Sequence, residues 1–248
     1  MTDTTAPLLY SLAFATFAAG AWAWKTRRIA VLEWALITAS ALATLSSLKL
    51  LDLHLVLKPL PMTIAMIFVA IRARATRANH RDEALLLAAL LFSLGGDVFL
   101  MLPGNYFIPG LASFLVAHLF YIALFRQGVP WFASRSALVA VLGFGAGMYA
   151  VLWNHLPDPV LAGAVGAYVT VISLMASQAI GRAKALATRP AYAVAAGACI
   201  FMASDSLIAI HKFLTPIPLE SLWILVTYFT AQFLIVHFMG PRPPGAQS

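Results

Sequence analysis

Long apolar runs separated by short polar gaps make up nearly the whole chain. Each run is close to the ~20 residues that a helix needs to cross a bilayer. The pattern predicts an all-α fold, a polytopic transmembrane helix bundle of about 8–9 helices with a polar pocket inside it. The predicted spans are 7–24, 29–48, 56–71, 84–102, 107–125, 136–153, 159–180, 191–210 and 219–239. We expect one domain over residues 1–240, followed by a short Pro-rich tail, 241–248, that is disordered.

Composition and charge agree with this prediction. The chain is 62% hydrophobic and 10% charged, which is more apolar surface than a soluble domain can hide. The net charge of +7 does not indicate nucleic acid, because the basic residues occupy short gaps between apolar runs. Cys199 is the single cysteine, so an internal disulfide and a Cys-based metal site are excluded.

The basic residues alternate between the gaps. Of the 16 Lys and Arg residues, all but Lys49, Lys58 and Lys212 follow an odd-numbered span or lie in the tail. This bias predicts an external N-terminus and a cytoplasmic C-terminus, in a bacterial-type inner (cytoplasmic) membrane. The first span is not expected to be a cleaved signal peptide, because its leader carries Asp3 and no basic residue.

Two aspartates lie inside apolar spans. Asp97 and Asp205 have no Lys or Arg in the surrounding stretches 90–101 and 199–208. A carboxylate in lipid costs roughly 3 kcal/mol or more, so both should face the protein interior or a wet cavity. Each lies about five residues before the outer end of its span, ~7–8 Å below that end. This matched depth indicates acid–base chemistry inside the bundle; the alternative is two protonated carboxyls buried only for packing.

Further polar side chains lie at compatible levels, and Gly95-Gly96 beside Asp97 permits close approach of a helix or ligand. The candidate substrate-binding residues are Lys58, Ser93, His118, Tyr121, Ser204, Tyr228 and Gln232. Each has a structural alternative. His118 is as readily a satisfied core histidine, Lys58 can snorkel to the interface, and the tyrosines and Gln232 can be helix–helix hydrogen-bonding groups.

Short motifs in this order resemble the middle of the lysoplasmalogenase family, the YhhN-like integral membrane proteins. They are Lys58-Pro59-Leu60, Ser93-Leu94-Gly95-Gly96-Asp97, Ala117-His118-Leu119-Phe120-Tyr121, Ala203-Ser204-Asp205-Ser206 and Thr227-Tyr228-Phe229. The resemblance covers roughly residues 58–238. It implies about eight helices and a hydrolase that cleaves the vinyl ether bond of lysoplasmalogens. The products would be a fatty aldehyde and glycerophosphoethanolamine or glycerophosphocholine.

The chemistry of this bond suits two carboxyls. A vinyl ether hydrolyses when its β-carbon is protonated, and water then captures the resulting oxocarbenium ion. The reaction needs a buried acid that stays protonated and a carboxylate that stabilises the cation or activates water. Asp97 and Asp205 are therefore the candidate catalytic residues, and the sequence leaves open which is the acid. No metal or cofactor is needed.

The expected partners are the lysophospholipid substrate and membrane lipids, with no nucleic acid; the oligomeric state is left open. Two other functions use the same residues. A transporter or proton-coupled channel would use Asp97 and Asp205 as a relay. A membrane metalloenzyme would use Asp97, His118 and Asp205 as ligands, and it ranks low because a close His pair is missing.

Overall fold

The computed structural model describes residues 31–47, 58–76 and 80–240, and the regular structure in these residues is entirely helical. The eight described helices are α2 (Val31–Ser47), α4 (Leu60–Thr76), α5 (His80–Met101), α6 (Phe107–Phe125), α7 (Arg135–Trp153), α8 (Pro159–Leu186), α9 (Arg189–Phe213) and α10 (Glu220–Phe238). They correspond to the second through ninth predicted spans, which confirms the all-α prediction. The first predicted span, 7–24, and the tail lie outside the described residues.

Six of these helices, α5 to α10, are long and apolar enough to cross a membrane. The other two, α2 and α4, have 17 residues each. The chain is thus an integral, multi-pass membrane protein, as its hydropathy pattern predicts.

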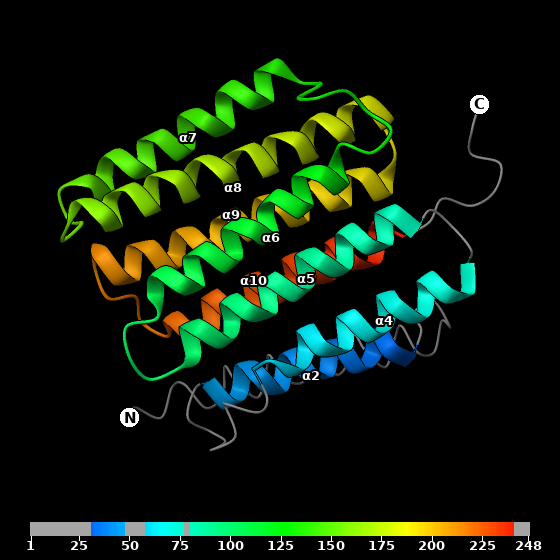
Figure 1. The fold of residues 1–248 in the computed structure, drawn as a ribbon, viewed down its shortest axis with the longest axis horizontal. Helices are drawn as coiled ribbons and strands as arrows, with labels where there is room; N and C mark the ends of the chain where they lie inside the picture. The colour runs from blue at the N-terminus through cyan, green and yellow to red at the C-terminus, as the bar shows by residue number, and fades with distance from the viewer. Residues whose placement is uncertain (1–30, 48–57, 77–79, 241–248) are drawn as a thin grey trace.

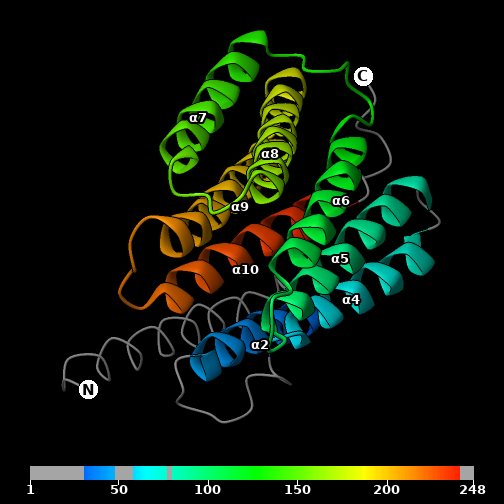
Figure 2. The ribbon, with the colours of Figure 1, turned by 60° about the vertical axis from the view of Figure 1, so that its left-hand side comes forward.

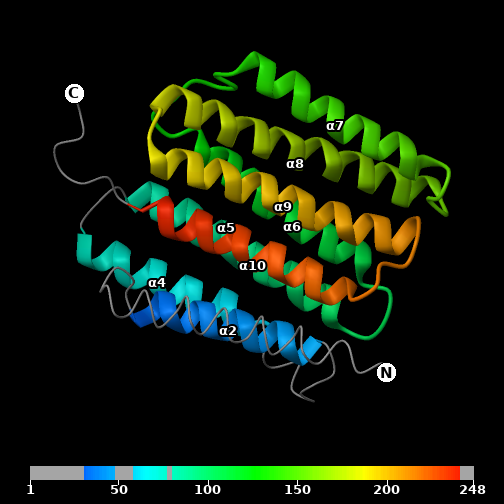
Figure 3. The ribbon, with the colours of Figure 1, turned by 180° about the vertical axis from the view of Figure 1, so that it is seen from behind.

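The helices lie side by side and alternate in direction (Figure 1). Following the contacts, α4 packs on α5, α5 on α6, α6 on α8, α8 on α9 and α9 on α10, while α10 returns to α2 and α4. The helix α7 packs mainly on α8 at the edge of the bundle (Figure 2), and α2 lies against α4 and α10 (Figure 3). The helices α4, α5, α6, α8, α9 and α10 therefore form a closed wall around the interior.

Side-chain caps mark the starts of three helices, close to the starts that hydropathy predicts. Side-chain oxygens of Ser134, Asp158 and Thr188 accept hydrogen bonds from backbone N–H groups in the first turns of α7, α8 and α9. The helix α8 continues to Leu186 and α9 to Phe213, beyond the predicted ends at 180 and 210. Charged residues end an apolar run, but a helix continues through them until its backbone is capped. The helix α4 begins at Leu60, directly after Pro59 and later than the predicted start at 56, because proline suits the beginning of a helix.

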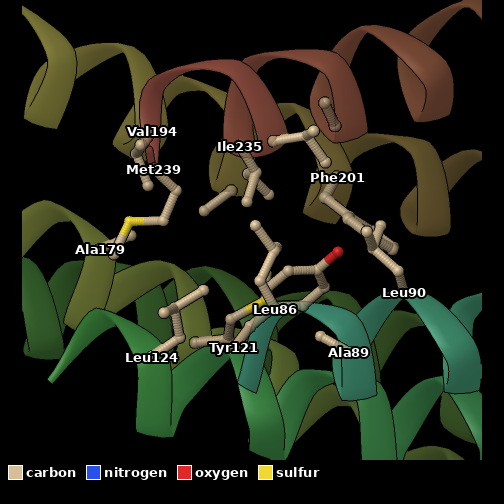
Figure 4. Packing of buried hydrophobic residues seen from close by; sticks show 14 of the residues in the cluster. Leu86, Ala89, Leu90, Tyr121, Leu124, Ala179, Val194, Phe201, Ile235 and Met239 are labelled. Carbon is tan, nitrogen blue, oxygen red and sulfur yellow. The ribbon is translucent and has the colours of Figure 1, made fainter. Parts of the chain in front are cut away.

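Close packing holds the wall together. Leu86 and Leu90 of α5 meet Tyr121 of α6, Phe201 of α9 and Ile235 of α10 in the core cluster (Figure 4). At Gly96 an added Cβ would lie 2.4 Å from the Phe114 ring, so α5 and α6 approach as closely as only glycine permits.

The two ends of the bundle differ in charge. The described basic residues of one end are Arg72, Arg74, Arg81, Arg126, Arg135, Arg182, Lys184 and Arg189, near the ends of α4, α6 and α8 and the starts of α5, α7 and α9. Lys58 and Lys212 lie at the opposite end, where α4 starts and α9 ends (Figure 1). The predicted alternation therefore holds in the described residues, and the side of the membrane that each end faces stays a prediction.

At the basic end, Arg72 forms a two-pronged ion pair with Glu83. Its Nε and Nη2 donate to the two Glu83 carboxylate oxygens at 2.9 Å each. The remaining Arg72 nitrogen, Nη1, donates to the Val236 carbonyl at 2.7 Å. This arrangement ties α4, α5 and α10 together on the side of the bundle away from Asp97.

Candidate active site

The two aspartates that stand out in the sequence both lie inside the bundle, on α5 and α9. Asp97 on α5 is buried, Asp205 on α9 is half-buried, and the two carboxyls lie close enough to interact electrostatically. The sequence predicts equal distances from the two helix ends, but the structure shows different ones. Asp97 lies four residues before Met101, whereas Asp205 lies eight before Phe213, because α9 continues about one turn beyond its predicted end.

Each carboxyl accepts a hydrogen bond from a tyrosine on an adjacent helix. The Tyr228 hydroxyl of α10 donates to Asp97 Oδ2 at 2.8 Å. The Tyr168 hydroxyl of α8 donates to Asp205 Oδ2. Sequence reasoning singled out Tyr228 but missed Tyr168. The sequence does contain a signal for Tyr168: this tyrosine lies in the middle of an apolar span, away from the interfacial positions where tyrosine is enriched.

A second set of predicted residues forms a hydrogen-bonded chain one turn deeper. The Tyr121 hydroxyl donates to Gln232 Oε1 at 2.6 Å, and Gln232 Nε2 donates to Ser93 Oγ at 3.3 Å. All three side chains are fully buried. Because Ser93 precedes Asp97 by one helical turn, this chain lies directly below the Asp97–Tyr228 pair and joins α5, α6 and α10.

His118 lies among aromatic rings. Its ring packs edge-on against Tyr168 at 5.3 Å and against Phe201 at 4.9 Å between centroids. The side chain is fully buried, and within the described part of the chain neither ring nitrogen has a hydrogen-bond partner. An unpaired buried polar group costs ~1–3 kcal/mol, which is uncommon in a purely structural position.

The two remaining predicted binding residues differ in placement. Lys58, in the turn before α4, lies close enough to Asp97 to interact electrostatically. The two residues form no salt bridge in the described part of the chain. Ser204 donates to the Ile224 carbonyl at 3.0 Å, so its hydroxyl joins α9 to α10.

A cavity of about 60 Å³ reaches Asp205. Tyr168 and Ser206 add the other hydroxyl groups to its lining, and the rest is mainly apolar side chains of α6 to α9, including Phe107 and Phe213. An apolar cavity that ends at a carboxyl suits a substrate whose reactive group lies within a hydrocarbon chain.

These features define a class of protein: a polytopic helical membrane protein with two carboxyls held by tyrosines inside the bundle. The YhhN family model matches residues 53–239, and the chain belongs to this family. No solved structure gives a significant match.

Three relatives illustrate the similarity. Human "Lysoplasmalogenase TMEM86A" is 32% identical over 72% of this chain and 75% of its own length. A Mycobacterium bovis protein named "Lysoplasmalogenase" is 31% identical over 86% of this chain and 85% of its own. Human "Lysoplasmalogenase TMEM86B" is 33% identical over 61% of each chain. The predicted family is confirmed, and with it the prediction that the chain is an enzyme of this kind.

Proposed function

We propose that this chain hydrolyses the vinyl ether bond of lysoplasmalogens, giving a fatty aldehyde and the glycerophospho-base. Relatives that carry the name lysoplasmalogenase support the activity, at 31–32% identity over most of the chain. The observation that carries the mechanism is that two carboxyls, each bonded to a tyrosine, lie inside the bundle, and one of them lines an apolar cavity.

The surroundings of the two carboxyls suggest separate roles. Asp205 lines the apolar cavity, where the alkenyl chain would lie, so it is the proposed acid. Asp97 interacts with the cation Lys58 and accepts a hydrogen bond from Tyr228, both of which favour a carboxylate. Asp97 is therefore the proposed counter-charge for the cation that forms during the reaction.

The proposed reaction balances without a metal or redox partner. The Asp205 carboxyl gives its proton to the β-carbon of the alkenyl chain, the C=C π bond breaks and an oxocarbenium ion forms. Water adds its oxygen to the α-carbon and returns a proton to Asp205. The hemiacetal then collapses: its hydroxyl loses a proton as the C=O bond of the aldehyde forms, the bond from the α-carbon to the glycerol oxygen breaks, and the glycerol oxygen takes up that proton.

The remaining polar residues have supporting roles in this proposal. Ser93, Tyr121 and Gln232 fix the positions of α5, α6 and α10 around Asp97. The His118 ring, which lies against Tyr168, offers unpaired nitrogens to the reacting ether or to water. We also propose that Lys58 supports the charge on Asp97.

Substrate choice tests the proposed function. Purified protein in detergent should release aldehyde from a 1-alkenyl lysophospholipid and leave the 1-acyl and saturated 1-alkyl analogues almost untouched. Protonation of an alkenyl carbon creates a resonance-stabilised cation, whereas ester cleavage normally needs an activated nucleophile, and the chain has no Gly-x-Ser-x-Gly motif. Asp97→Asn and Asp205→Asn should each lower kcat by about a hundredfold or more, with the protein still monodisperse.

Three results would contradict the proposal. Comparable release from acyl and alkenyl substrates would exclude the acid mechanism. Near-normal activity of either Asn variant would remove that aspartate from the site. No release from any substrate would instead favour a transporter that uses Asp97 and Asp205 as a relay, since such a protein needs a sealed compartment to act.

A further inference from the structure

A second cavity lies at the end of the bundle where α6 and α8 begin and α9 ends. It has a volume of about 390 Å³, and its polar lining comes from Asn105, His155, Asp158 and Lys212. None of these four residues belongs to the predicted site. The cavity shares Phe107 and Phe213 with the apolar cavity at Asp205, so the two spaces adjoin.

The cavity contains one cation and one anion that do not neutralise each other. Lys212 and Asp158 form no salt bridge with each other in the described part of the chain. The Lys212 ammonium is held instead over the aromatic ring of Phe107, with Nζ 4.4 Å from the ring centroid. Asp158 Oδ1 caps α8 by accepting from Leu161 N at 2.9 Å, and Oδ2 takes no part in that cap.

Separated opposite charges in one cavity match a zwitterion. A phosphate next to a primary or quaternary ammonium, as in an ethanolamine or choline head group, can place its anion at Lys212 and its cation at Asp158. A plain anion would meet the Asp158 carboxylate, and an uncharged glycerol group would leave both charges unpaired.

The spacing between Lys212 and Asp205 supports the same ligand. The two residues lie seven positions apart on α9, which places them on nearly the same helix face, two turns or ~10.5 Å apart. In a 1-alkenyl glycerophospholipid, seven bonds join phosphorus to the β-carbon that Asp205 would protonate, and seven extended bonds span ~8 Å. With a charge-assisted hydrogen bond of ~2.8 Å to the phosphate, the lipid is long enough to span the two helical turns between these residues.

We propose that this cavity binds the zwitterionic glycerophospho head group of a single-chain lipid, with the phosphate at Lys212 and the ammonium at Asp158. The glycerol then passes Phe107 and Phe213, and the start of the hydrocarbon chain lies in the apolar cavity beside Asp205. This assignment rests on the proposed function only for the reaction at Asp205. In this assignment Lys212 contacts the phosphate, and Lys58 acts on Asp97.

A binding measurement tests the head-group site without relying on activity. A saturated 1-alkyl lysophosphoethanolamine, which the proposed reaction cannot cleave, should raise the melting temperature of the purified protein in detergent. Lys212→Met should weaken this binding by about tenfold or more, and Lys212→Arg should restore most of it. Asp158→Asn is the matched test of the anion, because Asn caps a helix as well as Asp and keeps the start of α8 intact.

Ligands that lack one charge separate the two contacts. The alkyl glycerol 3-phosphate, which has no ammonium, should bind the Asp158→Asn variant at least as well as the unsubstituted protein. The alkylglycerol, which has no phosphate, should bind the Lys212→Met variant and the unsubstituted protein equally. Lys184→Met, at the opposite end of the bundle, is the control substitution and should bind every ligand normally.

Several results would overturn the assignment. It fails if inorganic phosphate stabilises the protein as well as the lipid does, or if Lys212→Met binds the lipid normally. It also fails if Lys58→Met, rather than Lys212→Met, removes the phosphate contribution. If alkyl-lipid binding follows this pattern but alkenyl lipid is not cleaved, the head-group site stands and the proposed reaction fails.

Discussion

At the scale of single residues, the two tyrosine–aspartate pairs are the distinctive chemistry of this molecule. Tyr228 and Tyr168 come from α10 and α8, and each donates its hydroxyl proton to a carboxyl on a neighbouring helix. A hydrogen bond contributes ~0.5–1.5 kcal/mol, and ~1.5–3 kcal/mol where the carboxyl is charged, enough to fix the orientation of a carboxyl in an apolar bundle. We therefore propose that the two tyrosines act as positioning residues of the site.

Removal of a single hydroxyl tests this role. Tyr168→Phe should lower kcat by about ten- to a hundredfold and change KM little, because Asp205 loses its fixed orientation while the ring remains in place. Tyr149→Phe is the matched control. The Tyr149 hydroxyl also donates a partly buried hydrogen bond, to the Ala162 carbonyl at 2.9 Å. Because Tyr149 lies outside the candidate site, loss of its hydroxyl should leave kcat unchanged. An equal fall in kcat for both variants would indicate a general effect on folding.

Sequence reasoning found those site residues whose own helix makes them costly in lipid. Asp97 and Asp205 stood out because a carboxyl needs an explanation in any apolar span. Tyr168, Lys212 and Asp158 were missed, because their importance depends on which helices are neighbours. A tyrosine in a span, or a charged residue at a helix end, is tolerated in a membrane protein even when it has no functional role. Only the fold therefore shows which groups these residues face.

At the scale of helices, close approach of α5 and α6 sets the position of Asp97. The neighbouring residue Gly96 faces Phe114 of α6, and a Cβ there would overlap the ring. The presence of eight of the nine predicted helices could be read from hydropathy, since lipid requires every backbone polar group to be paired within its segment. The C-terminal ends of α8 and α9 could not, because both helices continue beyond the apolar run through basic residues such as Arg182 and Lys212.

A glycine pair tests this packing. Gly96→Ala should lower the melting temperature in detergent by several degrees and reduce kcat, because overpacking costs ~1–3 kcal/mol and displaces the segment that carries Asp97. Gly147→Ala on α7 is the control: an added Cβ there has no neighbour within 4 Å, and Ala is favoured over Gly in a helix. Its melting temperature should stay the same or rise. Equal stability of the two variants would contradict the close α5–α6 contact.

At the scale of the whole molecule, charge divides the bundle into two ends. The described arginines and Lys184 lie at the end away from the site, and only Lys58 and Lys212 among the described cations lie at the other. The positive-inside rule assigns the arginine-rich end to the cytoplasm. Both proposed cation contacts, and the cavity lined by Lys212, would then open toward the outer leaflet.

Labelling from outside the cell tests this orientation. In a Cys199→Ala background, Asn105→Cys in the α5–α6 loop should react with a membrane-impermeant maleimide in intact cells. Ala133→Cys in the α6–α7 loop should react only after the cells are opened, because it adjoins Arg126 and Arg135 at the predicted cytoplasmic end. A reporter fused after Gln247 should likewise be cytoplasmic.

The reverse labelling pattern would move the head-group cavity to the cytoplasmic face, and substrate would then have to come from the inner leaflet. The chemistry at Asp205 would be unchanged in that case, since it depends on the helix contacts inside the bundle and not on which side of the membrane supplies the lipid.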